Sequence, residues 1–275
     1  MIESKVKNTI KKYKLCSKKD RILVAMSGGK DSTTVAYFLH KFGYNVEAIH
    51  INLLMGKWSD ENLRDVKIFC KKHKIKLHVY DVRKEIGYAL CYVKAVLKEK
   101  ANLKQCTVCG IIRRKILNQK AREIKATKLA TGHNLDDEAQ NVLMNLMKGN
   151  PELGINLGPR TGSISDKKFI PRIKPLYFIK ESEVRKFSEK HNLPVLYQRC
   201  PCVVGALRHK IRNQLDEFEK KNKDIKENLV NNFLKVQKQM RKNLKVKALK
   251  YCKHCGEPAR NEVCKACLML NQIGR

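Results

Sequence analysis

The sequence predicts an α/β protein, in which a parallel sheet carries helices on both faces and a small zinc ribbon follows at the C-terminal end. Two observations predict this fold class. Strand-like apolar runs alternate with helical runs from residue 21 to about residue 148, which is typical of a parallel sheet. Two C-x2-C pairs also stand close together after residue 250, as in zinc ribbons.

The elements follow one another in a regular order. Residues 1–14 form a predicted basic helix. The four predicted strands are "RILVAM", "NVEAIHIN", "KLHVYDV" and "KLATGH". Residues 150–166, rich in Gly, Pro and Ser, predict a mobile loop, and a helix is expected near 180–191. Residues 204 to about 249 are mostly helical in pattern and very basic.

The charge balance indicates a polyanionic partner. Lys and Arg number 59 against 26 for Asp and Glu, which gives a net charge of +33. Such an excess favours tRNA or another nucleic acid. An AT-rich genome would explain part of the lysine excess, but it would not explain the shortage of acids.

The composition also bears on the compartment. No apolar run of about 18 residues is present, so no membrane span is expected, and the N-terminal stretch lacks the apolar core of a signal peptide. We therefore expect a cytoplasmic protein. Eleven cysteines in such a protein indicate metal binding or catalysis rather than disulfides.

A glycine-rich turn follows the first predicted strand, in "VAMSGGKDSTTVAYFLH" (residues 24–40). Gly28 and Gly29 permit a tight turn and leave room for a ligand, while Lys30 and Ser32 supply donors. Backbone N–H groups converge there with the dipole of the following helix, so the turn predicts an anion site. The glycines are adjacent, which excludes the Walker pattern.

Three polar loops follow predicted strands and are expected at one edge of the sheet: "SGGKDS", "HINLLMGKWS" and "TGHNLDDEAQ". In the third loop, Asp137 is the candidate to face Mg²⁺ or the reacting nucleotide. The alternative is that this acid only complements the dipole of the helix that it opens.

The cysteines form two further groups. Two C-x2-C pairs separated by eight residues can close a tetrahedral Zn²⁺ site, whose ligands are Cys252, Cys255, Cys264 and Cys267. A second group combines "QCTVCG" with the distant "YQRCPC". The first pair alone suits a redox pair, half a zinc site or half a cluster site. Three cysteines of this group can hold three irons of a 4Fe–4S cluster, and a four-cysteine zinc site that uses Cys202 is the alternative.

"SGGKDS" resembles the PP-loop signature of ATP pyrophosphatases, the adenine nucleotide alpha hydrolase-like fold. The resemblance implies that ATP occupies the glycine turn, with Asp31 as a Mg²⁺ or orientation residue. The implied ATP-binding residues are Met26, Ser27, Gly28, Gly29, Lys30, Asp31, Ser32, His50 and Gly132.

With "CTVCG", "TGHNLDDEAQ", the late "RCP" cysteine and the C-terminal knuckles, the chain resembles the tRNA 2-thiolation enzymes of the archaeal, bacterial and eukaryotic cytosolic type. It is similar, more distantly, to the enzyme that thiolates cytidine in tRNA. The resemblance implies a homodimer that adenylates and 2-thiolates a pyrimidine in tRNA, with uridine the first choice. A 4Fe–4S cluster would carry the sulfur. The donor would be sulfide or a thiocarboxylated ubiquitin-like carrier protein.

Carried over to this chain, the cluster ligands are Cys106, Cys109 and Cys200, and the catalytic residues are Asp31, Asp137 and Arg113. Arg113 stands where some relatives have a catalytic lysine. The family commonly has an N-terminal zinc finger, whereas only Cys16 precedes the glycine turn here, which leaves the tRNA position open.

We divide the chain into four parts: a basic helix (1–20), the ATP-binding catalytic domain with the iron–sulfur site (21–200), a basic helical region (201–249) and a zinc module (250–275). Two other functions fit parts of the pattern. One is a cluster-free tRNA-modifying ligase similar to lysidine synthetase, and the other is a non-enzymatic zinc-ribbon protein that binds RNA.

Overall fold

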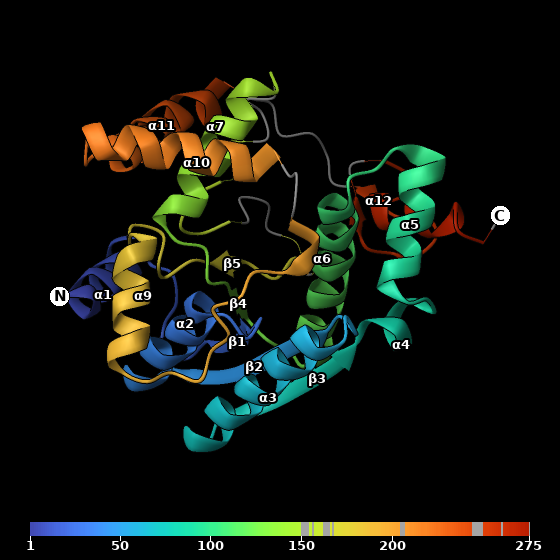
Figure 1. The fold of residues 1–275 in the computed structure, drawn as a ribbon, viewed down its shortest axis with the longest axis horizontal. Helices are drawn as coiled ribbons and strands as arrows, with labels where there is room; N and C mark the ends of the chain where they lie inside the picture. Colours follow the sequence, from blue (N-terminus) through green and yellow to red (C-terminus); the bar gives the residue numbers. More distant parts are fainter. Residues whose placement is uncertain are drawn as a thin grey trace.

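Five parallel strands lie at the centre of the computed structural model (Figure 1). It describes residues 1–149, 154–155, 157–161, 166, 168–203, 207–243, 250–259 and 261–274. The order across the sheet is β3–β2–β1–β4–β5, and every pairing is parallel. The strands are β1 (Arg21–Ala25), β2 (Asn45–Asn52), β3 (Lys76–Asp81), β4 (Lys128–Ala130) and β5 (Arg172–Ile173). The first four confirm the predicted runs. The fifth has only two residues and was not predicted.

Side chains of β1 alternate between two apolar layers, as the period of two in a strand requires. Ile22 and Val24 pack into a cluster with four helices, while Leu23 packs on the opposite face against the end of a fifth. Both faces are therefore covered, which confirms the predicted fold class. The first face carries α1 (Ile2–Lys12), α2 (Lys30–Lys41), α3 (Lys57–Lys72) and α9 (Glu181–Lys190); the second carries α4 (Val82–Ile86), α5 (Leu90–Ala101) and α6 (Gln105–Glu123).

Three helices form a separate group beyond the carboxyl edge of the sheet, at the top of Figure 1. They are α7 (Leu135–Met147), α10 (Leu207–Lys221) and α11 (Ile225–Asn243). Their shared core includes Leu135, Ile211 and Val230, all buried. The basic helical region thus packs directly on the helix that opens with the predicted acids.

The C-terminal residues dock on α6, away from that helical group (Figure 1). They comprise β6 (Lys250–Tyr251), β7 (Pro258–Ala259) and α12 (Lys265–Asn271). Met269 and Ile273 enter the same apolar cluster as α5 and α6. Glu257 accepts hydrogen bonds from Asn118 and Arg122 of α6. The module is therefore joined to α6 by both apolar and charged contacts.

The direction of strand addition reverses between β1 and β4. From β1 the chain continues outward to β2 and β3, and it then returns to place β4 on the other side of β1. Ligands of such sheets bind at the carboxyl ends of the strands that flank this reversal. The loops that follow β1 and β4 carry the glycine turn and the Thr-Gly-His step, so two of the three predicted loops meet there. The third, "HINLLMGKWS", follows β2.

The predicted loop at 150–166 falls largely outside the described residues. Among the helices that the structure describes, none combines the length and the apolar character needed to cross a membrane.

We expect Lys226→Met to destabilise the helical group. Lys226 is buried, and its Nζ lies 2.6 Å from Asp136, 2.5 Å from Asp216 and 2.8 Å from Glu219. Without the ammonium, the buried Asp136 would lose its counter-charge beside two partly exposed carboxylates, at a cost of about 3 kcal/mol. Denaturant unfolding measures this loss. Lys223→Met, an exposed lysine near the start of α11, is the matched control, and an equal effect of both variants would contradict the assignment.

Candidate active site at the carboxyl edge of the sheet

The glycine turn (residues 26–32) joins β1 to α2 and leaves the start of α2 open. Gly28 has φ of +87°, and a side chain there would strike Asn62, so glycine is required on two grounds. Gly29 is the N-cap of α2 and no side chain caps that helix. The first N–H groups of α2 are therefore available to an anion.

Hydroxyl groups stabilise the turn through hydrogen bonds to its own backbone. The backbone N–H of Ser27 donates to Oγ of Ser32 at 3.1 Å, and that hydroxyl donates to the carbonyl of Gly29 at 3.1 Å. Thr33 donates to the same carbonyl, also at 3.1 Å. These bonds fix the turn before any ligand arrives.

Lys30 and Asp31 lie in a small network of charges at the start of α2. Nζ of Lys30 lies 2.9 Å from Oδ2 of Asp31 and 2.8 Å from Oε1 of Glu181. The other oxygen of Asp31 accepts a hydrogen bond from the side chain of Asn134 at 2.9 Å. Arg212 pairs with Glu181 at 2.5 Å. The two candidate residues are thus held by α7, α9 and α10 together.

Gly132 allows the loop after β4 to touch the start of α2. A Cβ atom at Gly132 would lie 2.6 Å from the backbone nitrogen of Ser32 and 2.8 Å from the carbonyl carbon of Asp31. Both contacts are with backbone, so any larger residue would push the two loops apart. The position of Gly132 beside the glycine turn agrees with its predicted place at the site.

Asp137 caps the start of α7 and also has a raised pKa. Its backbone N–H donates to the side chain of Asn134 at 3.0 Å, and its own carboxylate accepts from the N–H of Asn134, so the pair forms a capping box at the start of α7. Burial nevertheless raises the pKa of Asp137 to about 6, helped by the nearby negative charge of Asp31 and opposed by Arg208. A helix-start acid in contact with water would not show this shift.

Two histidines, His133 and His50, also lie near these loops. His133 exchanges a hydrogen bond with Thr131 at 2.9 Å, and burial, with cations such as Lys174 close by, lowers its pKa to about 3. His50 is buried beneath the glycine turn, where Nδ1 lies 3.0 Å from the carbonyl oxygen of Met26. His50 therefore supports the turn from below.

The second cysteine group gathers at the start of α6. Cys106 is exposed and Cys109 is buried, one helical turn apart. The short 3₁₀ turn Pro201–Val203 packs on α6, and Sγ of Cys106 lies 3.6 Å from the carbonyl oxygen of Cys202. Cys200 and Cys202 thus come to the same place as the "CTVCG" pair, as the sequence predicted.

One segment connects this cysteine group to the glycine turn. The N–H of Leu196 donates to the carbonyl of Gly28 at 3.1 Å, and the carbonyl of Gln198 accepts from Trp58 at 3.3 Å. Because four residues of extended chain span at most about 14 Å, Cys200 must lie within that distance of Leu196. The cysteine group and the anion site are therefore neighbours.

The sulfurs of this second cysteine group are not gathered as closely as the ligands of a single metal ion. The sulfurs of Cys106, Cys109, Cys200 and Cys202 do not lie within 4.8 Å of one another, although all four residues are described. Thiolates that hold different irons of a cluster stand farther apart than thiolates around one zinc ion. The geometry thus disfavours the four-cysteine zinc site that uses Cys202.

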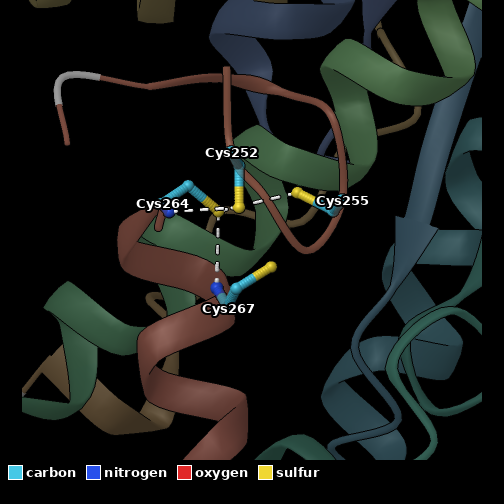
Figure 2. Close-up of side chains that lie close together, drawn as sticks. All are labelled: Cys252, Cys255, Cys264 and Cys267. Atoms are coloured by element: carbon cyan, nitrogen blue, oxygen red, sulfur yellow. Dashed lines mark hydrogen bonds between the residues drawn. The ribbon is translucent and has the colours of Figure 1, made fainter. Parts of the chain in front are cut away.

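The C-terminal cysteines are arranged for one ion (Figure 2). The sulfurs of all four lie within 4.8 Å of one another, and Cys255 and Cys264 approach to 3.7 Å between sulfurs. The N–H groups of Cys264 and Cys267 donate to sulfurs at 3.2 and 3.4 Å. Figure 2 shows the side chains of Cys252 and Cys255 meeting the first turn of α12. This arrangement suits a tetrahedral metal site.

Arg113 lies on an exposed part of α6, and its charge helps to lower the pKa of His133. The structure also shows partners that the sequence analysis missed. Glu181 and Asn134 hold Lys30 and Asp31, and both begin or cap helices far away in the sequence. Asn134 could have been found from the Asn-x-x-Asp spacing of a capping box.

Comparisons with known proteins agree with this geometry. Residues 1–216 match the PP-loop domain. The chain is 37% identical over 265 residues to the tRNA-5-methyluridine(54) 2-sulfurtransferase of Pyrococcus horikoshii, covering 96% of this chain and 83% of that protein. It is 30% identical to the cytoplasmic tRNA 2-thiolation protein 1 of Caenorhabditis elegans, covering 98% and 72% of the two chains.

A solved structure is similar along nearly the whole chain. It is the U34-tRNA thiolase NcsA from Methanococcus maripaludis with its [4Fe-4S] cluster, with a TM-score of 0.81 and 30% identity. The likeness covers 98% of this chain and 85% of that one.

We expect Asp137→Asn to stabilise the protein at neutral and alkaline pH. The folded-state pKa of about 6 lies above the ordinary value of 3.8, so the ionised carboxylate opposes folding. The gain should be absent below about pH 4, grow as the pH rises through 6, and reach at most about 3 kcal/mol. Denaturant unfolding at several pH values measures it. Exposed Asp60→Asn is the control. A variant that is less stable at alkaline pH would mean that Asp137 serves mainly as a cap.

Proposed function

Because the chain belongs to the PP-loop family and to its tRNA 2-sulfurtransferase branch, we propose that it is an ATP-dependent enzyme that 2-thiolates a uridine in tRNA. The named relatives act at different uridines, at position 54 in one and position 34 in another. We therefore assign a tRNA uridine as the substrate class and no single position.

One observation carries this proposal: the segment from Leu196 to Cys202 touches the glycine turn at one end and the α6 cysteines at the other. A cluster-free ligase would have no use for three cysteines beside its nucleotide. A zinc-ribbon protein that only binds RNA would need neither the open start of α2 nor Asp137 with its raised pKa. The juxtaposition favours an activated nucleotide and a sulfur source at one site.

The first step activates the base. The N–H groups at the start of α2 and the ammonium of Lys30 would hold the phosphates of ATP, and Asp31 would hold a Mg²⁺ ion that neutralises their charge. The 2-oxygen of the uridine attacks the α-phosphate, the bond to the β-phosphate oxygen breaks, and pyrophosphate leaves. Since its pKa lies near 6, Asp137 is suited to accept the N3 proton of the uridine as the new bond forms.

The second step replaces AMP by sulfur at C2. Cys106, Cys109 and Cys200 would hold three irons of a 4Fe–4S cluster, whose fourth iron offers an open position for sulfur from sulfide or from a thiocarboxylated carrier protein. The adenylated oxygen is a good leaving group, so AMP departs. Arg113, on the same helix as two of the cysteines, is suited to neutralise charge that develops on the phosphate of AMP.

Other features complete the proposal. Zn²⁺ in the C-terminal site would stabilise residues 250–275, which are too few to fold by burial alone. The net charge of +33 suits a tRNA partner. We propose a homodimer, and a cytoplasmic location in agreement with the name of the Caenorhabditis relative.

The metal content tests the proposed function. Protein purified without oxygen should carry about four irons and one zinc per chain. Ala in place of Cys106, Cys109 or Cys200 should remove iron and thiolation but retain zinc and ATP binding, because the glycine turn is untouched. Cys264→Ala should lose zinc before it loses iron.

Cys91→Ala, at an exposed cysteine on α5, is the control for these variants. Iron-free protein that still modifies tRNA with ATP would favour a cluster-free ligase. If Cys200→Ala retained iron and Cys202→Ala lost it, the third cluster ligand would be Cys202 and not Cys200.

We also expect tRNA binding to weaken steeply with salt, since each phosphate that a lysine or arginine neutralises releases counterions. Binding isotherms at rising salt concentration measure the slope. A flat response would leave the base composition of an AT-rich genome as the explanation of the many lysines.

A further inference from the structure

Lys94 is a buried lysine on α5 with no carboxylate partner among the described residues. Lys94 is only 4% exposed to solvent. Its Nζ contacts two sulfur atoms, Sγ of Cys202 at 3.5 Å and Sδ of Met55 at 3.9 Å. No ion pair within the described parts of the chain includes it, in contrast to the buried Lys226 and Lys174, each of which has a carboxylate.

A buried ammonium with no counter-charge opposes folding, because the interior solvates a charge poorly. The neighbours of Lys94 on the same helix face are the buried residues Leu90, Val93 and Leu97. An apolar residue at position 94 would complete this face at no electrostatic cost. Lys98, one turn later on α5, is exposed to solvent, as is usual for a lysine. The position of Lys94 therefore requires a negative partner.

The side chain of Lys94 points to the cysteine group. Cys202 is two residues from Cys200 and places its carbonyl oxygen against Cys106. Since Nζ of Lys94 lies 3.5 Å from Sγ of Cys202, the ammonium lies beside the segment that brings Cys200 to α6. A cluster held by three thiolates carries a net negative charge, and it becomes more negative on reduction. The ammonium lies beside the cysteines that would hold such a cluster.

We propose that Lys94 is the counter-ion of the iron–sulfur site, which it stabilises without ligating iron, and that it anchors the Pro201–Val203 turn through Cys202. This inference rests on the proposed function. It makes Lys94 a positioning residue, and it gives Cys202 the part of a contact for the ammonium rather than of a fourth ligand.

The charge has a predictable effect. A nearby positive charge stabilises the reduced cluster more than the oxidised one, because the reduced cluster is more negative. Removal of that charge should lower the reduction potential and speed the release of iron to a chelator. The protein without iron should be as stable or more stable, because an uncompensated buried charge has gone.

The experiment compares four proteins purified and reconstituted without oxygen: the unmodified chain, Lys94→Met, Lys94→Arg and the matched control Lys98→Met. Iron per chain, the rate of iron release to a chelator and the reduction potential are measured, with zinc content and thermal unfolding of the iron-free protein as checks on the fold. Lys94→Met should release iron at least several-fold faster and have a lower potential. Lys94→Arg, which keeps the charge, and Lys98→Met should resemble the unmodified chain.

Three outcomes would overturn the inference. If Lys94→Met matches the unmodified chain in iron release and potential, Lys94 is only a core side chain. If Lys94→Arg and Lys94→Met lose iron equally, the effect comes from packing and not from charge. If the unmodified chain binds no iron at all, the proposed function fails and this inference fails with it, and that result is distinguishable from the other two.

Discussion

The close approach of the backbone at Gly132 to the start of α2 sets the geometry of the whole site. Only a residue without Cβ allows the loop after β4 to lie against Asp31 and Ser32. The approach puts Asn134 within hydrogen-bonding distance of Asp31, and it brings Asp137 close enough for the two carboxylates to affect each other. The loops after two neighbouring parallel strands therefore form a single site, in which Asp31 is fixed by a hydrogen bond and Asp137 holds its proton more tightly.

Charged residues connect the same site to helices α10 and α11. Glu181 bridges Lys30 to Arg212 of α10, while Asp136 bridges the backbone of Glu181 to Lys226 of α11. The basic helices are thus tied to the glycine turn by ion pairs between buried or partly buried side chains, and such pairs are stronger there than at an open surface. A partner that binds these helices would act on a framework that already includes Lys30.

Local patterns in the sequence predicted much of this arrangement. The strand alternation gave the sheet, and the spacing of four cysteines gave the compact site near the C-terminus, because each depends on neighbours within a few residues. Glu181, Lys94 and the two-residue strand β5 were missed. Each acts through contacts with segments about 40 to 150 positions away, and no local periodicity records such contacts. The raised pKa of Asp137 likewise depends on burial that only the assembled fold creates.

The docking of residues 265–273 on α6 has a consequence for biosynthesis. Met269 and Ile273 complete the apolar cluster that also contains Cys109 and Ile112. During translation, α6 leaves the ribosome long before these residues. The face of α6 that they cover, on the helix with Cys106 and Cys109, therefore stays exposed to water until residue 273 has been made. If α6 holds a cluster as proposed, the site would be fully covered only after synthesis, and ribosomes that stall before that point would release chains with exposed, oxidisable thiols.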